Sequence, residues 1–148
     1  MTNTTTNPPH LTHKHTIRVR FSEVDSLQIV WHGHYIKYFE EGREAFGRAF
    51  GLSYLDVKKE GYATPIVNTN TSHKYPLHYG DMATIETSYI NTEAAKLKFA
   101  YSIKNDSGQV VCTGETIQVF TSLESGEMAL VLPDFFRDWK IKHKLLNV

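Results

Sequence analysis

The chain has 148 residues, of which 41% are hydrophobic and 22% charged; this suits one folded domain with its own core and excludes disorder throughout. Sixteen Lys and Arg residues balance sixteen Asp and Glu residues, so the formal net charge is zero. Proteins that bind nucleic acids usually carry a basic excess, so we expect no nucleic-acid partner. No apolar run approaches the roughly 20 residues of a membrane span, so no membrane-spanning segment is predicted.

Cys112 is the single cysteine, which excludes an intrachain disulfide and a multi-cysteine zinc site. The first residues are polar, contain two prolines and lack the apolar stretch of a secretory signal, so we expect a cytoplasmic protein. Residues 1–13 are predicted to form a flexible arm that includes His10 and His13, with His15 close behind. Residues 14–148 are predicted to form a single domain.

The first predicted strand begins at Thr16, because Ile17, Val19 and Phe21 alternate with polar residues. Residues 23–34 break this alternation and indicate a loop. A helix is predicted over 33–50, where aromatic and small residues recur at spacings of three and four, and Gly51 suits its C-terminal cap.

The rest of the chain is predicted to be mostly β-structure. The expected elements are a short helix over 53–60, extended segments over 62–75, 83–89, 97–103 and 110–121, and a basic helix over 133–146. One long helix on a five-stranded antiparallel sheet is an α+β arrangement. A single helix covers only part of such a sheet, so we expect the chain to form a homo-oligomer.

Asp25 follows the first strand and shortly precedes the helix that begins near His32 and Gly33. The free N–H groups of a helix N-terminus can stabilise an oxyanion, and a nearby carboxylate can act as nucleophile or general base. On spacing alone, a capping or solvated Asp is the simpler interpretation. His32 and His34 have no third ligand nearby, and no phosphate-binding glycine motif is present, so we expect neither metal nor cofactor.

The segment VDSLQIVWHGHY at 24–35, followed by IKYFEEGREAF, resembles the signature of hot-dog-fold thioesterases of the 4-hydroxybenzoyl-CoA thioesterase and acyl-CoA thioesterase type. The later segment YPLHYGDMATIET at 75–87 is similar to the strand, turn and strand of that family. The resemblance implies a hot-dog fold, in which an antiparallel sheet wraps a central helix, and active sites at a dimer interface.

The resemblance also implies the roles of individual residues. Asp25 falls on the catalytic aspartate, and His32 on the first helix residue, whose N–H polarises the thioester carbonyl. Tyr35 falls on the last tyrosine of the motif. We expect substrate contacts from Trp31, Gly33, Tyr35 and Phe39.

Two positions depart from the family pattern. Gln28 stands where glycine is usual, and such a glycine suits a backbone conformation that glutamine would strain. His34 stands where asparagine or serine is usual. A second kind of hot-dog thioesterase carries its carboxylate on the helix, where this chain has Glu40, Glu41 and Glu44; a polar face or an Arg43 partner is the simpler interpretation.

The predicted function is hydrolysis of an acyl thioester of coenzyme A or acyl carrier protein by a dimer or tetramer. Lys96 and Lys98, and less securely Lys74, are predicted to bind the substrate's phosphates; solvated surface lysines are the alternative. Two other functions stay open: an acyl-thioester-binding domain without hydrolysis, and an acyl-thioester hydratase or dehydratase.

Overall fold

The computed structural model describes residues 11–146. Residues 1–10 of the predicted arm, His10 among them, lie outside the described residues. The helices and strands, in chain order, are β1 (Thr12–Arg18), η1 (Phe21–Glu23), α1 (His34–Phe50), α2 (Tyr54–Lys59), β2 (Tyr62–Ala63), β3 (Ile66–His73), β4 (Met82–Ile90), β5 (Lys96–Lys104), β6 (Val110–Val119), β7 (Thr121–Ser122) and α3 (Asp134–Lys142).

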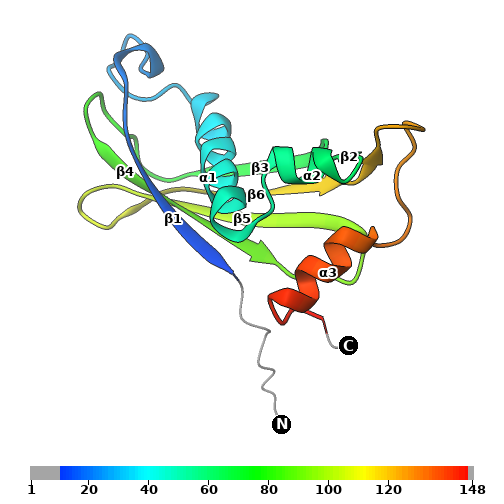
Figure 1. Cartoon of the computed structure of the whole chain (residues 1–148). Helices are drawn as coiled ribbons and strands as arrows, with labels where there is room; N and C mark the ends of the chain where they lie inside the picture. Colours follow the sequence, from blue (N-terminus) through cyan, green and yellow to red (C-terminus); the bar gives the residue numbers. More distant parts are fainter. Residues whose placement is uncertain (1–10, 147–148) are drawn as a thin grey trace.

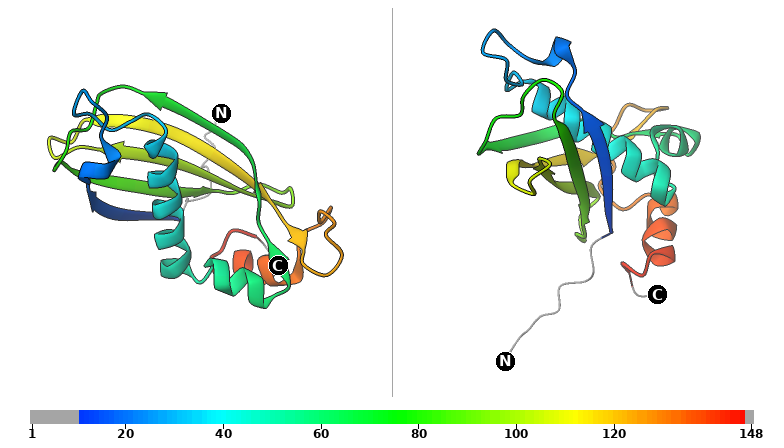
Figure 2. Two further views of the ribbon diagram at one scale, coloured as in Figure 1. Left: turned by 90° about the horizontal axis from the view of Figure 1, so that it is seen from above. Right: turned by 90° about the vertical axis from the view of Figure 1, so that its left-hand side faces the viewer.

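The predicted α+β architecture is confirmed, with α1 lying across one face of a curved sheet (Figures 1 and 2). The five main strands pair antiparallel in the order β1-β4-β5-β6-β3, and β2 pairs with β7 separately. Helices α2 and α3 lie at the end of the molecule away from the loop between β1 and α1 (Figure 1). No helix among residues 11–146 is both long and apolar enough to cross a bilayer.

Alternating side chains of β4 and β5 form the floor of the core, and the apolar face of α1 lies on it. Phe39 stacks on Tyr101 with ring centroids 4.4 Å apart, and Phe46 meets Phe99 at 5.1 Å. A Cβ at Gly42 would stand 2.6 Å from Ile85 Cγ2, so glycine lets the helix approach the sheet this closely. The predicted cap is also confirmed, because Gly51 has a φ of 73°.

The first strand begins earlier than predicted and ends earlier too. β1 starts at Thr12, inside the predicted arm, and its inward positions include His13 and His15, which are half-buried rather than frayed. Phe21 belongs to η1 and is 71% exposed, so it does not continue the buried face of the strand. Pairing with β4 extends β1 because an adjacent strand satisfies its backbone regardless of polar sequence.

The two edges of the sheet differ in their cover. β1 packs beside α1, whereas β3 is exposed at nearly every position and pairs only with β6. Val67 on β3 is 56% exposed. An edge strand of this length with apolar residues is a template for pairing with another chain.

Candidate active site

Asp25 begins a tight hairpin between η1 and α1. Its N–H donates to Ile29 O at 2.9 Å and its carbonyl accepts from Gln28 N–H at 2.9 Å, while Val24 and Val30 form a bridge at the base. The carboxylate is half-buried, and its Oδ1 accepts from Leu27 N–H at 2.8 Å. The hairpin therefore orients the Asp25 side chain by its own backbone.

Gln28 adopts the left-handed conformation expected of the glycine it replaces, with a φ of 68°. A non-glycine residue pays about 1–2 kcal/mol for this conformation. The departure thus strains the hairpin. The loop is also tied to the sheet, since Ile29 bridges His78 and Val30 N–H donates to Leu77 O at 2.8 Å.

The turn before α1 presents backbone donors close to this hairpin. Trp31 N–H donates to Glu23 O, and His34 N–H donates to Trp31 O at 2.9 Å. Within residues 11–146, no hydrogen bond engages the N–H of His32 or Gly33. These two groups lie at the positive end of α1 and can stabilise a developing oxyanion.

The helix starts slightly later than predicted. His34 is its first residue and Gly33 its N-cap, so His32 belongs to the preceding turn and is not the first helix residue. Gly33 has a φ of −69° and a ψ of −19°, which continues the helical path backwards. His32 therefore lies in the turn just before the helix, and its N–H group is available to a ligand atom.

Trp31 covers the start of the helix. Its ring lies 4.9 Å from the His32 ring and 5.7 Å from the His34 ring, centroid to centroid. A Cβ at Gly33 would overlap the six-membered ring of the indole, so glycine permits this arrangement. Trp31 is 49% exposed and therefore accessible to a ligand.

Two of the predicted substrate-binding residues are buried in the core of the chain. Tyr35 is 3% exposed and Phe39 is fully buried. The Tyr35 ring lies 5.1 Å from that of His73, and its hydroxyl accepts from Leu77 N–H at 3.4 Å. Burial raises the pKa of Tyr35, so this hydroxyl stays protonated. Helical periodicity placed both residues on the face that meets the sheet, which is why their side chains are covered.

Lys96 and Lys98 lie at the other end of the sheet from Asp25 in the same protomer. Lys98 pairs with Ile90 at the end of β4, whereas the Asp25 loop is tied to the segment just before β4. Strand geometry puts about 25 Å between the two ends. Lys74 follows β3 at the end of the sheet where Tyr35 contacts His73.

The helix glutamates divide into paired and unpaired groups. Glu44 makes an ion pair with Arg48 at 2.9 Å, and Glu40 lies 3.7 Å from Arg43, as the simpler interpretation predicts. Glu41 makes no ion pair within residues 11–146 and borders two cavities.

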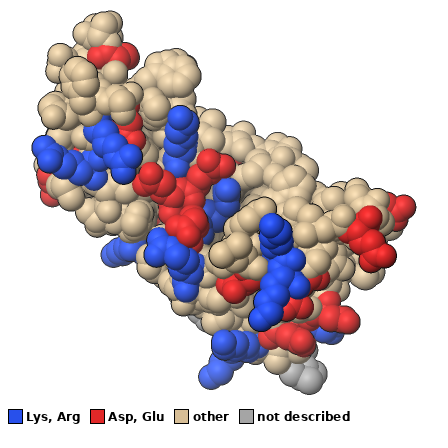
Figure 3. Space-filling view, turned by 45° about the horizontal axis from the view of Figure 1, so that its top comes forward, with Lys and Arg blue, Asp and Glu red and all other residues tan. Residues whose placement is uncertain are grey.

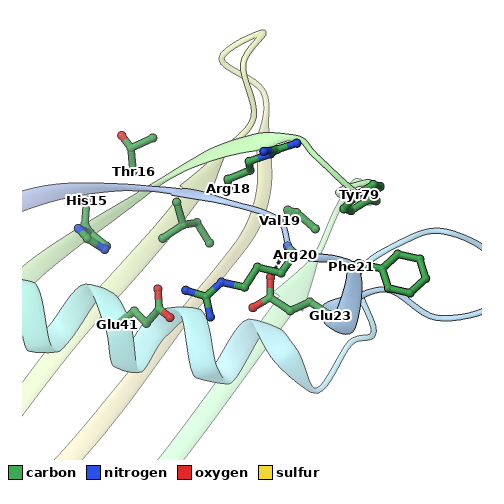
Figure 4. A pocket seen from close by; sticks show the side chains of 10 residues that line it. His15, Thr16, Arg18, Val19, Arg20, Phe21, Glu23, Glu41 and Tyr79 are labelled. Atoms are coloured by element: carbon green, nitrogen blue, oxygen red, sulfur yellow. Dashed lines mark hydrogen bonds between the residues drawn. The ribbon is translucent and has the colours of Figure 1, made fainter.

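The larger cavity, about 960 Å³, is a groove between α1 and the α2–β2 segment. It begins at Lys37, one turn into α1. Its apolar lining consists of Leu52, Tyr54, Val57, Ala63, Pro65, Leu97 and Phe99. No sequence motif indicates this groove, because its walls come from segments that are far apart in the chain. The second cavity, about 520 Å³, lies between β1, η1 and α1 (Figure 4).

Cys112 is a buried free thiol. It is fully buried, and burial raises its pKa to about 11, so it does not supply a thiolate nucleophile at neutral pH. Its Sγ lies 3.9 Å from His73 Nδ1. Residues 11–146 contain no cluster of His, Cys, Asp or Glu suited to a metal ion.

The Thioesterase-like superfamily matches residues 19–140 of the chain. The Bacillus subtilis (strain 168) protein named "Putative acyl-CoA thioesterase YneP" is 32% identical over 126 residues, which cover 85% of this chain and 91% of that protein.

Two solved structures share the fold. A DHNA-CoA thioesterase from Staphylococcus aureus superposes with a TM-score of 0.81 at 24% identity, covering 90% of this chain and 89% of the other. A 1,4-dihydroxy-2-naphthoyl-CoA thioesterase from Synechocystis superposes with a TM-score of 0.78 at 20% identity, covering 90% and 98%. The chain therefore belongs to the thioesterase-like superfamily and has its hot-dog fold.

Proposed function

We propose that the protein hydrolyses an acyl thioester of coenzyme A, or of acyl carrier protein, to the free acid and the thiol. The observation that carries this proposal is that the Asp25 carboxylate and the free N–H groups of His32 and Gly33 belong to one hydrogen-bonded loop. Membership of the superfamily and the name of the Bacillus subtilis relative support it.

The two parts of this loop perform complementary tasks. The N–H groups polarise the thioester carbonyl and stabilise the oxyanion; removal of one such donor typically costs about 2.7–4 kcal/mol. Asp25 attacks the carbonyl carbon or takes a proton from the attacking water. In the first route the carbon–sulfur bond breaks, the thiolate leaves, and water then hydrolyses the acyl anhydride on Asp25 to the free acid. In the second route water adds to the carbonyl carbon, the carbon–sulfur bond breaks, and the proton held by Asp25 passes to the departing thiolate.

The groove beside α1 is the place we propose for the acyl group. It reaches Lys37, four residues after Gly33, its exposed surface is more apolar than polar, and about 960 Å³ lies within the range of small-molecule sites. This assignment replaces Tyr35 and Phe39, which the core buries, with exposed lining residues such as Tyr54 and Pro65.

A homo-oligomer, dimer or tetramer, would complete the site. If two β3 edges pair antiparallel about a two-fold axis, Ile66 of the partner subunit lies beside His73 of this one. Ile66 pairs with Gln118, which pairs with Leu97, so Lys96 and Lys98 of the partner subunit come to the end of the sheet that holds Asp25. There they would bind the phosphates of the substrate.

Surface charge and the single thiol support two further parts of the proposal, that the protein has no nucleic-acid partner and that it is cytoplasmic. On the face in Figure 3, acidic and basic side chains are interspersed rather than gathered in one basic area, as expected for a protein without a nucleic-acid partner. We place the enzyme in the cytoplasm, because its only cysteine is buried and needs no oxidising compartment.

The Asp25→Asn variant tests the function directly. With a panel of aliphatic and aromatic acyl-CoAs, the wild-type protein should release free thiol, and Asp25→Asn should lower kcat by about 10²–10⁴-fold with an unchanged melting temperature. Asp138→Asn, on α3 at the far end, is the matched control and should keep full activity. A variant with wild-type kcat would move the catalytic role to Glu41. Products that retain the thioester would indicate a hydratase.

Complementation between a catalytically inactive chain and a chain with weakened substrate binding tests the shared site. Asp25→Asn chains and Lys96→Ala/Lys98→Ala chains are mixed under refolding conditions, so that mixed oligomers form. If the lysines act across the interface, each mixed dimer has one intact site, which combines Asp25 of one chain with the lysines of the other. The mixture should then hydrolyse the thioester with the low KM of the wild-type protein. No recovery despite confirmed mixed oligomers, or a single-chain mass in light scattering, would contradict this arrangement.

A further inference from the structure

Glu23 lies where the Asp25 loop meets α1, and three donors converge on it. The Tyr38 hydroxyl donates to Glu23 Oε1 at 2.9 Å, and Arg20 N–H donates to the same oxygen at 2.8 Å. The carbonyl oxygen of Glu23 accepts from Trp31 N–H at 3.0 Å. Figure 4 shows the Glu23 side chain between Arg20 and the α1 ribbon.

These bonds connect the two reacting parts of the site. Glu23 stands two residues before Asp25, and Trp31 stands directly before His32 and Gly33. The hydrogen bond from Trp31 N–H to the Glu23 carbonyl holds the turn that contains His32 and Gly33 against η1, the segment that leads to Asp25. The hydrogen bond from the Tyr38 hydroxyl to the Glu23 carboxylate anchors this turn and η1 to the second turn of α1.

Tyr38 is a rigid support for this connection. It is 1% exposed, and its ring meets that of Tyr35 at 5.8 Å, edge to face. Burial, and then the Glu23 carboxylate, raise the pKa of Tyr38, so the hydroxyl remains a donor over the working pH range. Hydrogen bonds to charged acceptors are shorter and stronger than neutral ones.

We propose that Glu23 and Tyr38 are positioning residues, which set the separation between the Asp25 carboxylate and the N–H groups of His32 and Gly33. The inference rests on the proposed thioester hydrolysis and extends it from the reacting groups to the residues that hold them. Neither residue contacts the reacting atoms. A displacement of about 1 Å between such groups can cost about 10²-fold in rate, so a small relaxation of the loop matters.

The Tyr38→Phe variant removes only the hydroxyl and is the primary test. We expect kcat to fall at least about tenfold while KM for the same acyl-CoA stays within about twofold. Tyr89→Phe is the matched control, because Tyr89 is a fully buried tyrosine that packs on Trp139 near α3. It should keep wild-type kcat. Equal losses in the two variants, or an unchanged kcat in Tyr38→Phe, would overturn the proposal.

Two further variants separate positioning from general stability. Glu23→Gln keeps an oxygen acceptor and should recover most of the activity that Glu23→Ala loses. In the Asp25→Asn background, Tyr38→Phe should cause no additional loss of rate, because its effect acts through Asp25. Full additivity of the two losses would show that Tyr38 acts independently of Asp25.

Amide hydrogen exchange gives a readout that does not depend on activity. Exchange over residues 24–33 should accelerate in Tyr38→Phe and stay unchanged in Tyr89→Phe. If the wild-type protein hydrolyses no thioester, the proposed function fails while this measurement still reports on the anchoring of the loop. Unchanged exchange in Tyr38→Phe would reject the anchoring role, whatever the function.

Discussion

The crossing of α1 over the sheet and the loop that carries Asp25 are adjacent but are held in different ways. At the crossing, Phe39 stacks on Tyr101 and Gly42 brings the helix against Ile85, with almost no exposed surface. In the loop, Leu27 is 73% exposed and Trp31 49% exposed. There the chain is held by backbone hydrogen bonds, the Val24–Val30 bridge and the contacts of Glu23.

This difference separates stability from activity. Burial at the crossing is non-directional and involves many side chains, so it stabilises the whole domain. The loop contributes little burial, but its few directional bonds set the geometry of the reacting groups. Substitutions at the crossing should therefore lower the free energy of unfolding, and substitutions in the loop should slow the reaction while the domain keeps its stability.

Phe46→Ala should produce the largest loss of stability. Phe46 is fully buried between Phe50 and Phe99, at 4.6 and 5.1 Å, so truncation leaves a cavity and should cost about 3–5 kcal/mol of unfolding free energy. Urea titration followed by circular dichroism measures this change. Activity per folded molecule should change little.

Phe21→Ala is the control for exposure, because Phe21 is 71% exposed on the loop side. The unfolding free energy of Phe21→Ala should differ from that of the wild-type protein by no more than about 0.5 kcal/mol. Similar losses in the two variants would remove the distinction between crossing and loop.

Gly33→Ala should show the opposite behaviour, with a folded protein of lower activity. The added methyl group collides with the Trp31 indole, which is exposed enough to move aside and uncover the helix start. We expect kcat/KM to fall about tenfold with a nearly unchanged melting temperature. Steady-state kinetics and thermal melts measure both.

Trp31→Ala removes the ring with which the added methyl group collides, so the two single variants and their double variant form a double-mutant cycle. If the indole is the only neighbour that matters, the double variant Trp31→Ala/Gly33→Ala should equal Trp31→Ala alone. An additional loss in the double variant would show that the methyl group obstructs the backbone donors themselves.

Gln28→Gly should have the smallest effect, a gain of up to about 1 kcal/mol in stability. The φ of 68° costs less for glycine, although glycine also loses more backbone entropy on folding. Lys144→Gly is the matched control, since Lys144 has a φ of 60° far from the site. Both variants should raise the melting temperature slightly, and only Gln28→Gly should alter kinetics. A lower melting temperature for Gln28→Gly would indicate that its side chain stabilises the hairpin.

Local patterns predicted most elements within a few residues. The helix over 33–50 follows from aromatic and small residues at helical spacing, and β5 follows from strict alternation of Leu97, Phe99, Tyr101 and Ile103. The strained backbone at Gln28, where φ is 68°, was indicated by the family resemblance, in which glycine is usual at this position, and not by a local pattern. The hydrophobic pattern did not predict the start of β1, which begins at Thr12 in a polar segment, because pairing with β4 extends this strand.

The amino-acid sequence by itself determined the elements, the core face of α1 and the proximity of Asp25 to the helix start, because each depends on residues close in the chain. Tertiary structure decided which side chains face a ligand. It buried Phe39 against Tyr101, opened a groove between α1 and α2, and separated Lys96 from Asp25 by the length of the sheet. It also placed Tyr38 against Glu23. Such contacts depend on how α1 crosses the sheet and on strand order, and residues far apart in the chain meet only once those are set.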